Sequence, residues 1–297
     1  SNNMFIIKEL IQLGYYPQLK LNECMPRQDY IDLPKITDAD LPDILSTEIL
    51  EQENKRATVK INIYNPAGET IEKIEVKYLT TKIVSQNYKD GKSEVIVELT
   101  NPIQCISRYS IISLTTKGVH NVEYTKKYEQ GEQNIDINFY NEIYTIDDWY
   151  QMKKNAKQNY KLMNDLDFVN ANPSRYIGIE LQSELEGNGY TIKNFYTKYP
   201  LFTNLNRNTK IENLNIKNFN IDSSENDLDV GICGWGSLYS MKNINIEGYT
   251  AKTDNNANKR VGSIIANSLR GKLENITISD VKITANNKQY LKLGGVI

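Results

Sequence analysis

Aliphatic and polar residues alternate in the last third of the chain, in a pattern that recurs about every 30 residues. Each copy has the order aliphatic, charged, Asn, aliphatic, polar, aliphatic. Three copies align without gaps over residues 211–216, 241–246 and 273–278, and a weaker copy covers residues 192–197. The shared asparagine of these copies is found at Asn194, Asn213, Asn243 and Asn275.

A second motif recurs between these copies and keeps the same phase. It covers residues 230–233, 261–264 and 293–296, and each copy has Val or Leu followed by Gly. We predict tight corners at these structural glycines, which are Gly231, Gly262 and Gly294. This alignment gives Cys233 the same position as Ile264, which predicts that Cys233 is a small residue of the core.

A repeat of this length cannot bury its apolar face alone, so successive copies must stack. Coils stacked about 4.8 Å apart pair their backbone groups and bring like side chains into ladders. Asparagine tolerates the left-handed conformation of a bend, and its amide can bond the same amide in the next coil. We therefore predict a right-handed parallel β-helix with an asparagine ladder in residues 142–297.

Residues 42–141 have a different pattern, with short alternating runs and turns roughly every 8–12 residues. The runs cover residues 58–63, 71–79, 82–88, 95–99, 108–115 and 134–140. Asp90-Gly91 is typical of a hairpin turn. Six or seven strands of this kind predict an immunoglobulin-like β-sandwich, although the Cys…Trp…Cys spacing of antibody domains is absent.

Two short helices are expected outside these strands. Residues 3–13 have helical apolar spacing and end at Gly14, and the Pro-containing stretch up to residue 41 is expected to be an extended lead-in. Thr145 and Asp148 approximate a capping box for a second helix over residues 146–154. This helix would cover the end of the β-helix. The predicted fold class is therefore all-β, with domains at 1–41, 42–141 and 142–297.

Composition removes several classes of function. A net charge of −2 without a prominent basic cluster argues against nucleic-acid binding. No segment approaches the roughly 18 consecutive apolar residues of a membrane span. Cys24, Cys105 and Cys233 are far apart, and His120 is the only histidine. This composition gives no basis for a disulfide framework, a paired-histidine zinc site or a Ser-His-Asp triad, and we expect no metal and no cofactor.

The polar stretches 222–229, 252–260 and 284–291 occupy the same place in each repeat, where solenoids often form their binding face. Asp229 and Arg260 hold equivalent positions, which predicts an ion pair between neighbouring coils. Trp235 is expected either to stand on the surface as an interface anchor or to cover the core locally. The candidate recognition surface consists of Asp227, Asp229, Trp235, Tyr239 and Arg260.

A carbohydrate-active β-helix, either a polysaccharide lyase or a glycosidase, is the enzymatic alternative. Its chemistry requires paired carboxylates or carboxylate ligands for calcium. The pairs Asp165 with Asp167 and Asp227 with Asp229 have the i, i+2 spacing that places two side chains on one face of a strand. Asp165 and Asp167 are equally typical of an opening turn, so we favour a chain without catalysis.

Residues 160–168 (YKLMNDLDF) and 185–194 (LEGNGYTIKN) together resemble the opening of the β-helical N-terminal region of Gram-positive immunoglobulin A proteases and related surface zinc metalloproteases. The Val-Gly repeats are similar to the GLUG motif of bacterial surface proteins. The resemblance covers about residues 142–297. It implies a secreted or wall-attached parent protein whose zinc site lies beyond residue 297, because the His-Glu-x-x-His motif is absent from this chain.

The expected function is a non-catalytic extracellular scaffold and recognition module, which holds or orients a protein substrate of a zinc metallopeptidase. An adhesin that binds a host or environmental protein or glycan is the alternative. The chain stops inside a repeat, so we expect it to be a segment of a longer surface protein.

Overall fold

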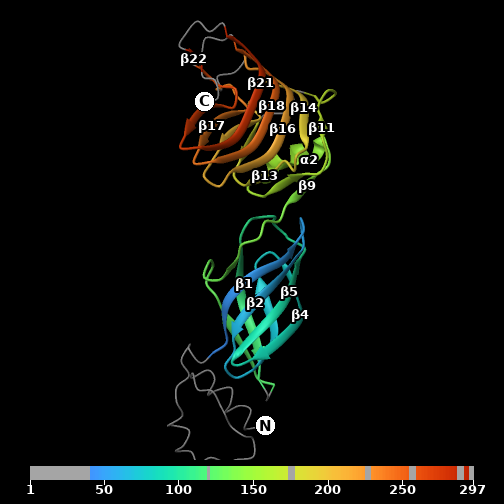
Figure 1. Cartoon of the computed structure of the whole chain (residues 1–297), viewed down its shortest axis with the longest axis vertical. Helices are drawn as coiled ribbons and strands as arrows, with labels where there is room; N and C mark the ends of the chain where they lie inside the picture. The colour runs from blue at the N-terminus through green and yellow to red at the C-terminus, as the bar shows by residue number, and fades with distance from the viewer. Residues whose placement is uncertain are drawn as a thin grey trace, which may run out of the picture. The chain divides into compact units, whose positions relative to one another are not determined.

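The computed structural model describes residues 41–118, 121–172, 178–224, 229–253, 259–285 and 291–293. The predicted N-terminal helix and nearly all of the lead-in lie outside these residues, as do Cys24, His120, Asp227 and Gly294. The described chain forms two compact units (Figure 1). The first contains residues 41–51, 57–100 and 110–135, and the second contains 52–56, 101–109 and the residues described from 136 onward. The predicted domains 42–141 and 142–297 differ from these units in two loops and in residues 136–141.

The first unit consists of two antiparallel sheets, which supports the predicted β-sandwich. One sheet has the order β1-β2-β5-β4, and the other has the order β3-β6-β7 with β8 paired to β6. The strands are β1 Asp43–Gln52, β2 Ala57–Tyr64, β3 Thr70–Val76, β4 Thr80–Lys89, β5 Lys92–Thr100, β6 Tyr109–Lys117, β7 Glu123–Lys127 and β8 Asn134–Ile135. Alternate residues of β2 are buried, as expected for a strand with one face on a core.

Several details of the first unit differ from the sequence prediction. The hairpin at Asp90 and Gly91 is confirmed, since both residues have positive φ (50° and 75°) between β4 and β5. The run 134–140 was too long, because only its first two residues form a strand. Strand β1 was missed because Ile44 is its only buried residue and its sequence lacks apolar alternation.

The second unit is a β-solenoid of about four turns, as predicted for the C-terminal part of the chain. Strands β13, β16, β18 and β21 run side by side in parallel (Figure 1). The long sheet contains β9 Asn141–Ile143, β10 Tyr160–Leu162, β11 Leu166–Asp167, β13 Glu184–Glu186, β14 Thr191–Thr197, β16 Lys210–Asp222, β18 Ser240–Thr253 and β21 Lys272–Ala285. A second parallel sheet contains β12 Ile179–Leu181, β15 Phe202–Leu205, β17 Cys233–Ser237 and β20 Ile265–Leu269. The third contains β19 Lys259–Val261 and β22 Leu291–Leu293.

The predicted capping helix is present as α2 Ile146–Gln151, followed by the 3-10 helix η2 Met152–Asn155. Thr145 and Asp148 form the predicted capping box. Trp149 of α2 is fully buried, and its ring lies 6.4 Å from that of Phe168. From Phe168 an aromatic column continues through Phe195 and Phe219 to Tyr249, with successive ring centroids 4.4, 5.5 and 6.1 Å apart. The helix is thus joined to the core that the coils share.

The predicted asparagine ladder is present at Asn213, Asn243 and Asn275, which all have φ near 54°. The amide Nδ2 of Asn243 donates to Oδ1 of Asn213 (2.8 Å), and Nδ2 of Asn275 donates to Oδ1 of Asn243 (3.0 Å). In the coil before them the same position is held by Gly187. A Cβ there would lie 2.4 Å from the carbonyl oxygen of Asn213.

Asn194 belongs to a different ladder from the one predicted. Strand β14 pairs with the second half of β16, so Asn194 lies beside Asn218. Nδ2 of Asn218 donates to Oδ1 of Asn194 (3.1 Å), and Asn194 donates to Oδ1 of Asp167 (2.8 Å). Gly248 and Asp280 continue this second row of left-handed residues. The prediction was wrong because residues 192–197 match residues 216–221 better than the repeat used for alignment.

The predicted alignment of residues after the glycine corners also needs one correction. Val230 pairs with Val261, whereas Cys233 pairs with Ile265 and not with Ile264, so the later coil has one extra residue after its corner. Cys233 is nevertheless buried in the core. Gly231 and Gly262 are required by close packing, since a Cβ on Gly262 would lie 2.3 Å from the carbonyl oxygen of Ile265.

Replacing Asn243 tests the ladder. Asn243→Ala removes two amide hydrogen bonds, worth about 1 kcal/mol each, and leaves a Cβ in the left-handed region at a cost of about 1–2 kcal/mol. We expect the free energy of unfolding, measured in urea, to fall by about 3 kcal/mol. Asn243→Gly keeps the bend without strain and should lose about 1 kcal/mol less. Equal stability of both variants and the wild type would contradict a supporting role for the ladder.

Candidate functional site

The predicted recognition surface is only partly present. Nη1 of Arg260 lies 3.0 Å from Oδ2 of Asp229, and the backbone N–H of Arg260 donates to Oδ1 of Asp229 (2.9 Å). The ion pair expected between neighbouring coils is therefore formed. Half of the Arg260 side chain is exposed, so the pair contributes at most about 1 kcal/mol. Asp227 lies outside the described residues.

Tyr239 does not belong to a surface, because it is 1% exposed. Its ring occupies a slot between Gly236 and Gly271, where a Cβ on either glycine would lie 2.5 Å or less from the ring. The hydroxyl is 2.7 Å from Oγ of Ser268. The prediction of an exposed Tyr239 was wrong, since the two glycines that form the slot are 35 residues apart in the sequence.

Trp235 is on the outer side of the sheet β12-β15-β17-β20 and is 38% exposed. Parallel register places it between Asn204 on β15 and Asn267 on β20, and Asn204 lies beside Glu180 on β12. We call this line, Glu180, Asn204, Trp235 and Asn267, the outer row. Oδ1 of Asn204 is buried without a hydrogen-bond partner. Of the two possibilities left open for Trp235, the structure favours the surface position.

An open cleft lies at the β12 end of the outer row. Its volume is about 700 Å³. The lining residues come from the loop 101–109, from η2 and the turn after it, and from β12 and β15; they are Gln104, Lys153, Lys154, Asn155, Ala156, Lys157, Gln158, Gly178, Glu180, Gln182 and Thr203. Among the described residues, no carboxylate forms an ion pair with any of the three lysines. The sequence prediction missed this cleft, because its residues come from four separate segments.

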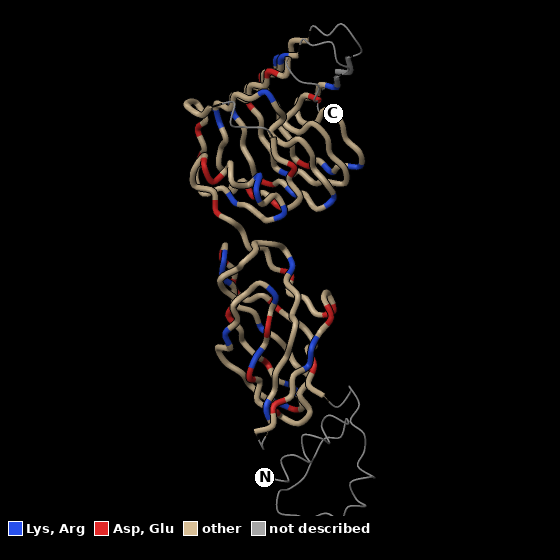
Figure 2. The backbone as a smooth tube through the Cα atoms, turned by 180° about the vertical axis from the view of Figure 1, so that it is seen from behind, with Lys and Arg blue, Asp and Glu red and all other residues tan. Residues whose placement is uncertain are grey.

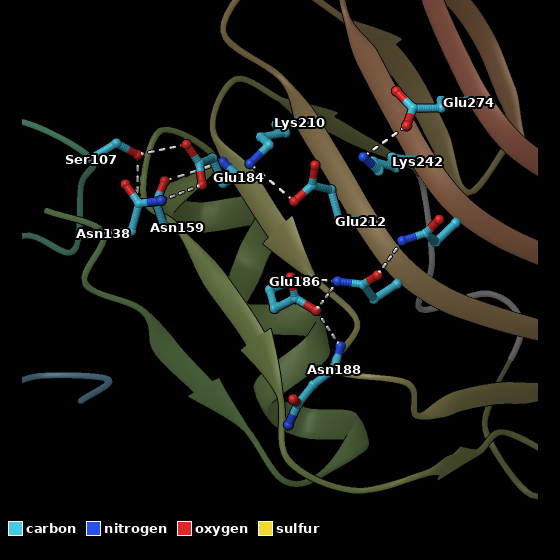
Figure 3. A network of polar contacts seen from close by, with 12 residues as sticks. Ser107, Asn138, Asn159, Glu184, Glu186, Asn188, Lys210, Glu212, Lys242 and Glu274 are labelled. Atoms are coloured by element: carbon cyan, nitrogen blue, oxygen red, sulfur yellow. Dashed lines mark hydrogen bonds and ion pairs between the residues drawn. The ribbon is translucent and has the colours of Figure 1, made fainter. Parts of the chain in front are cut away.

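Most carboxylates on the outside of the long sheet are already bonded (Figure 3). Glu184 accepts hydrogen bonds from Oγ of Ser107 (2.9 Å) and Nδ2 of Asn138 (3.1 Å). It also accepts one from the hydroxyl of Tyr140 (3.2 Å). Oε1 of Glu186 accepts from the backbone N–H of Asn188 (2.6 Å). The cavity beside Glu184 and Glu186 measures only about 10 Å³, which leaves room for no more than one water molecule. Both carboxylate oxygens of Glu186 also accept from Nδ2 of Asn213 in the next coil (3.1 Å each), so this carboxylate joins two coils.

Ion pairs between coils continue this arrangement along the solenoid. Lys217 and Glu247 are 3.0 Å apart, and Lys242 and Glu274 are 2.7 Å apart. In Figure 2 positive and negative residues are accordingly interspersed along the coils. Charges that pair within the stack leave little net field on that face.

The first candidate catalytic pair is also bonded within the protein. Oδ1 of Asp165 accepts from the backbone N–H of Thr191 (2.8 Å). Oδ1 of Asp167 accepts from Asn194 and from the N–H of Val169 (3.1 Å), and Lys193 lies 3.5 Å from its Oδ2. The hydrogen bond from Asn194, followed by that from Val169, lowers the pKa of Asp167. A general acid requires a raised pKa, so Asp167 is poorly suited to that role.

The described cysteines have no reactive character. Cys105 and Cys233 are both buried, and burial raises the pKa of each thiol. Within the described ranges no group of three or more His, Cys, Asp or Glu side chains is arranged to hold a metal ion. The helices among the described residues lack the length and apolar character of a membrane span.

No family model, curated protein or solved structure matches this chain. The resemblance to the immunoglobulin A protease region and to GLUG repeats therefore stays a prediction.

The stabilising role of Asp167 can be tested by its pH dependence. Because its folded-state pKa is lowered, its carboxylate stabilises the fold above the unfolded pKa of about 3.9, and this contribution is lost as the pH falls through the lower folded-state pKa. We expect Asp167→Asn to lower the melting temperature at pH 7, with the difference shrinking below about pH 4. Glu180→Gln, at an exposed carboxylate, is the control and should change the melting temperature at pH 7 less than Asp167→Asn does. A difference for Asp167→Asn that is independent of pH would contradict this role.

The two tryptophans should behave differently towards a neutral quencher. Trp149 is fully buried and Trp235 is exposed, so acrylamide should quench only the Trp235 emission. Trp235→Phe should remove the quenchable fraction of the fluorescence, whereas Trp149→Phe should leave it. Strong quenching that survives Trp235→Phe would show that Trp149 is accessible and that the core differs from the one described.

Proposed function

We propose that this chain is a non-catalytic scaffold and recognition module of an extracellular bacterial surface protein. The observation that carries the proposal is which outward-facing polar groups of the solenoid are already bonded within the protein. Carboxylates and amides along the long sheet bond neighbouring coils. The cleft beside β12, by contrast, has free volume and three lysines that form no ion pair with a carboxylate among the described residues. A stack of bonded coils with an open polar cleft suits binding better than chemistry.

The kind of parent protein and the finer description of the fold are inferred from the sequence. The resemblance implies a parent zinc metallopeptidase, for which this module would hold or orient a protein substrate. The right-handed sense of the solenoid and the immunoglobulin-like character of the sandwich belong to the same proposal. The two antiparallel sheets of the first unit support the sandwich at the level of architecture.

An adhesin that binds a glycan is the second candidate function. The exposed indole of Trp235 on the outer row favours it. The enzymatic alternative is weaker, since Asp165 and Asp167 are occupied by bonds within the protein.

Activity assays test the absence of catalysis. The purified chain, incubated with immunoglobulin or casein in the presence of zinc, should release no fragments on a denaturing gel. Polyuronides incubated with the chain and calcium should release neither unsaturated sugars, measured by ultraviolet absorbance, nor reducing ends. Clear turnover in either assay that scales with the amount of chain would overturn the proposal.

A further inference from the structure

We propose that the cleft and the outer row together bind one linear acidic polysaccharide. Its carboxylate or sulfate groups would lie among Lys153, Lys154 and Lys157, and one of its sugar rings would lie against Trp235. This inference rests on the proposed recognition function and names the class of ligand for that module.

The charge of the cleft favours an anion. Three lysines line it against a single carboxylate, that of Glu180. Elsewhere on the solenoid, lysines such as Lys217 and Lys242 are paired with glutamates of the next coil. Ammonium groups that have no carboxylate partner among the described residues and lie around one concave site attract anionic ligands. This attraction weakens as the salt concentration rises, because the groups are exposed.

The remaining lining suits hydroxyl groups. Gln104 and Gln182 each carry both a donor and an acceptor, and Thr203 adds a hydroxyl. Gln158 can add only its amide N–H groups, because its Oε1 already accepts from the backbone N–H of Cys105 and from Nδ2 of Asn141. Sugar hydroxyls also donate and accept, so they can satisfy such groups in either direction. Ala156 is the one aliphatic side chain among the described lining residues. A peptide would find no apolar pocket for aliphatic or aromatic side chains here.

The spacing of the outer row suits an extended polymer. Glu180, Asn204 and Trp235 occupy consecutive parallel strands, which are about 4.8 Å apart, so the indole lies about 10 Å along the row from the cleft. Trp235 is 38% exposed, so part of the indole is accessible to a ligand. A chain of sugars that runs across the strands would meet the lysines first and then the apolar face of the indole.

The test uses the full chain and four probes: a polyuronate oligosaccharide, a sulfated glycosaminoglycan oligosaccharide, neutral dextran and poly-L-glutamate. Binding is measured by calorimetry and by protection of Trp235 from acrylamide. At least one acidic oligosaccharide should bind and protect Trp235, and comparison of the two identifies the preferred anionic group. Dextran and poly-L-glutamate should bind at least about tenfold more weakly.

Two variants and one matched control locate the site. The triple variant K153Q/K154Q/K157Q should weaken binding about tenfold, and Trp235→Ala should weaken it about fivefold. The control K82Q/K89Q/K282Q removes the same charge from exposed lysines outside the cleft and should bind as the wild type does. Circular dichroism and the melting temperature establish that each variant is folded.

Each contrary result overturns the inference. These results are no binding of either acidic oligosaccharide, equal binding of poly-L-glutamate or dextran, equal loss in the control variant, and binding without protection of Trp235. Cleavage of a bound oligosaccharide would instead overturn the non-catalytic function while leaving the ligand class in place. Failure to bind any glycan would leave a protein-binding module standing.

Discussion

The second unit depends on one backbone constraint, the bend of three successive coils at left-handed residues that lie directly over one another. Asn213, Asn243 and Asn275 meet this constraint in two ways, because their side chains both tolerate positive φ and bond one another. Once these residues are stacked, the register of the strands between them is fixed. The aromatic column from Phe168 to Tyr249 follows from that register, since Phe195, Phe219 and Tyr249 occupy one position in successive coils.

The same constraint decides where polar groups can act. Side chains that point outward from stacked coils lie within bonding distance of their equivalents, so acids meet lysines and amides meet amides. Such groups are numerous on the surface and are nevertheless bonded within the structure. Glu184 is an example, since its carboxylate accepts three hydrogen bonds from side chains of the protein. An unbonded polar group is therefore more informative on this fold than a polar group as such.

The sequence was most informative where the repeat was regular. The asparagine ladder, the capping box of α2 and the Asp229–Arg260 pair follow from spacing alone. Prediction failed where the chain departed from the repeat. Because the later coil has one extra residue after Gly262, Cys233 pairs with Ile265 and not with the predicted Ile264. Asn194 belongs to the second ladder, because its segment matches the second half of β16 better than the first. Tyr239 and the lysine cleft were beyond a local pattern, because each is defined by residues that only the fold brings together.

The position of the cleft follows from the way in which the stack begins. A regular coil must supply apolar residues inside and a left-handed residue at each bend, so few of its positions can be given to a ligand. The first coils are different, because η2 and the turn after it occupy space beside β12 where no equivalent strand is needed. Lys153, Lys154 and Lys157 are thus free of the ladder, while β15 and β17 continue the surface beyond them. A ligand site placed there uses the rigidity of the stack without interrupting the contacts that hold it together.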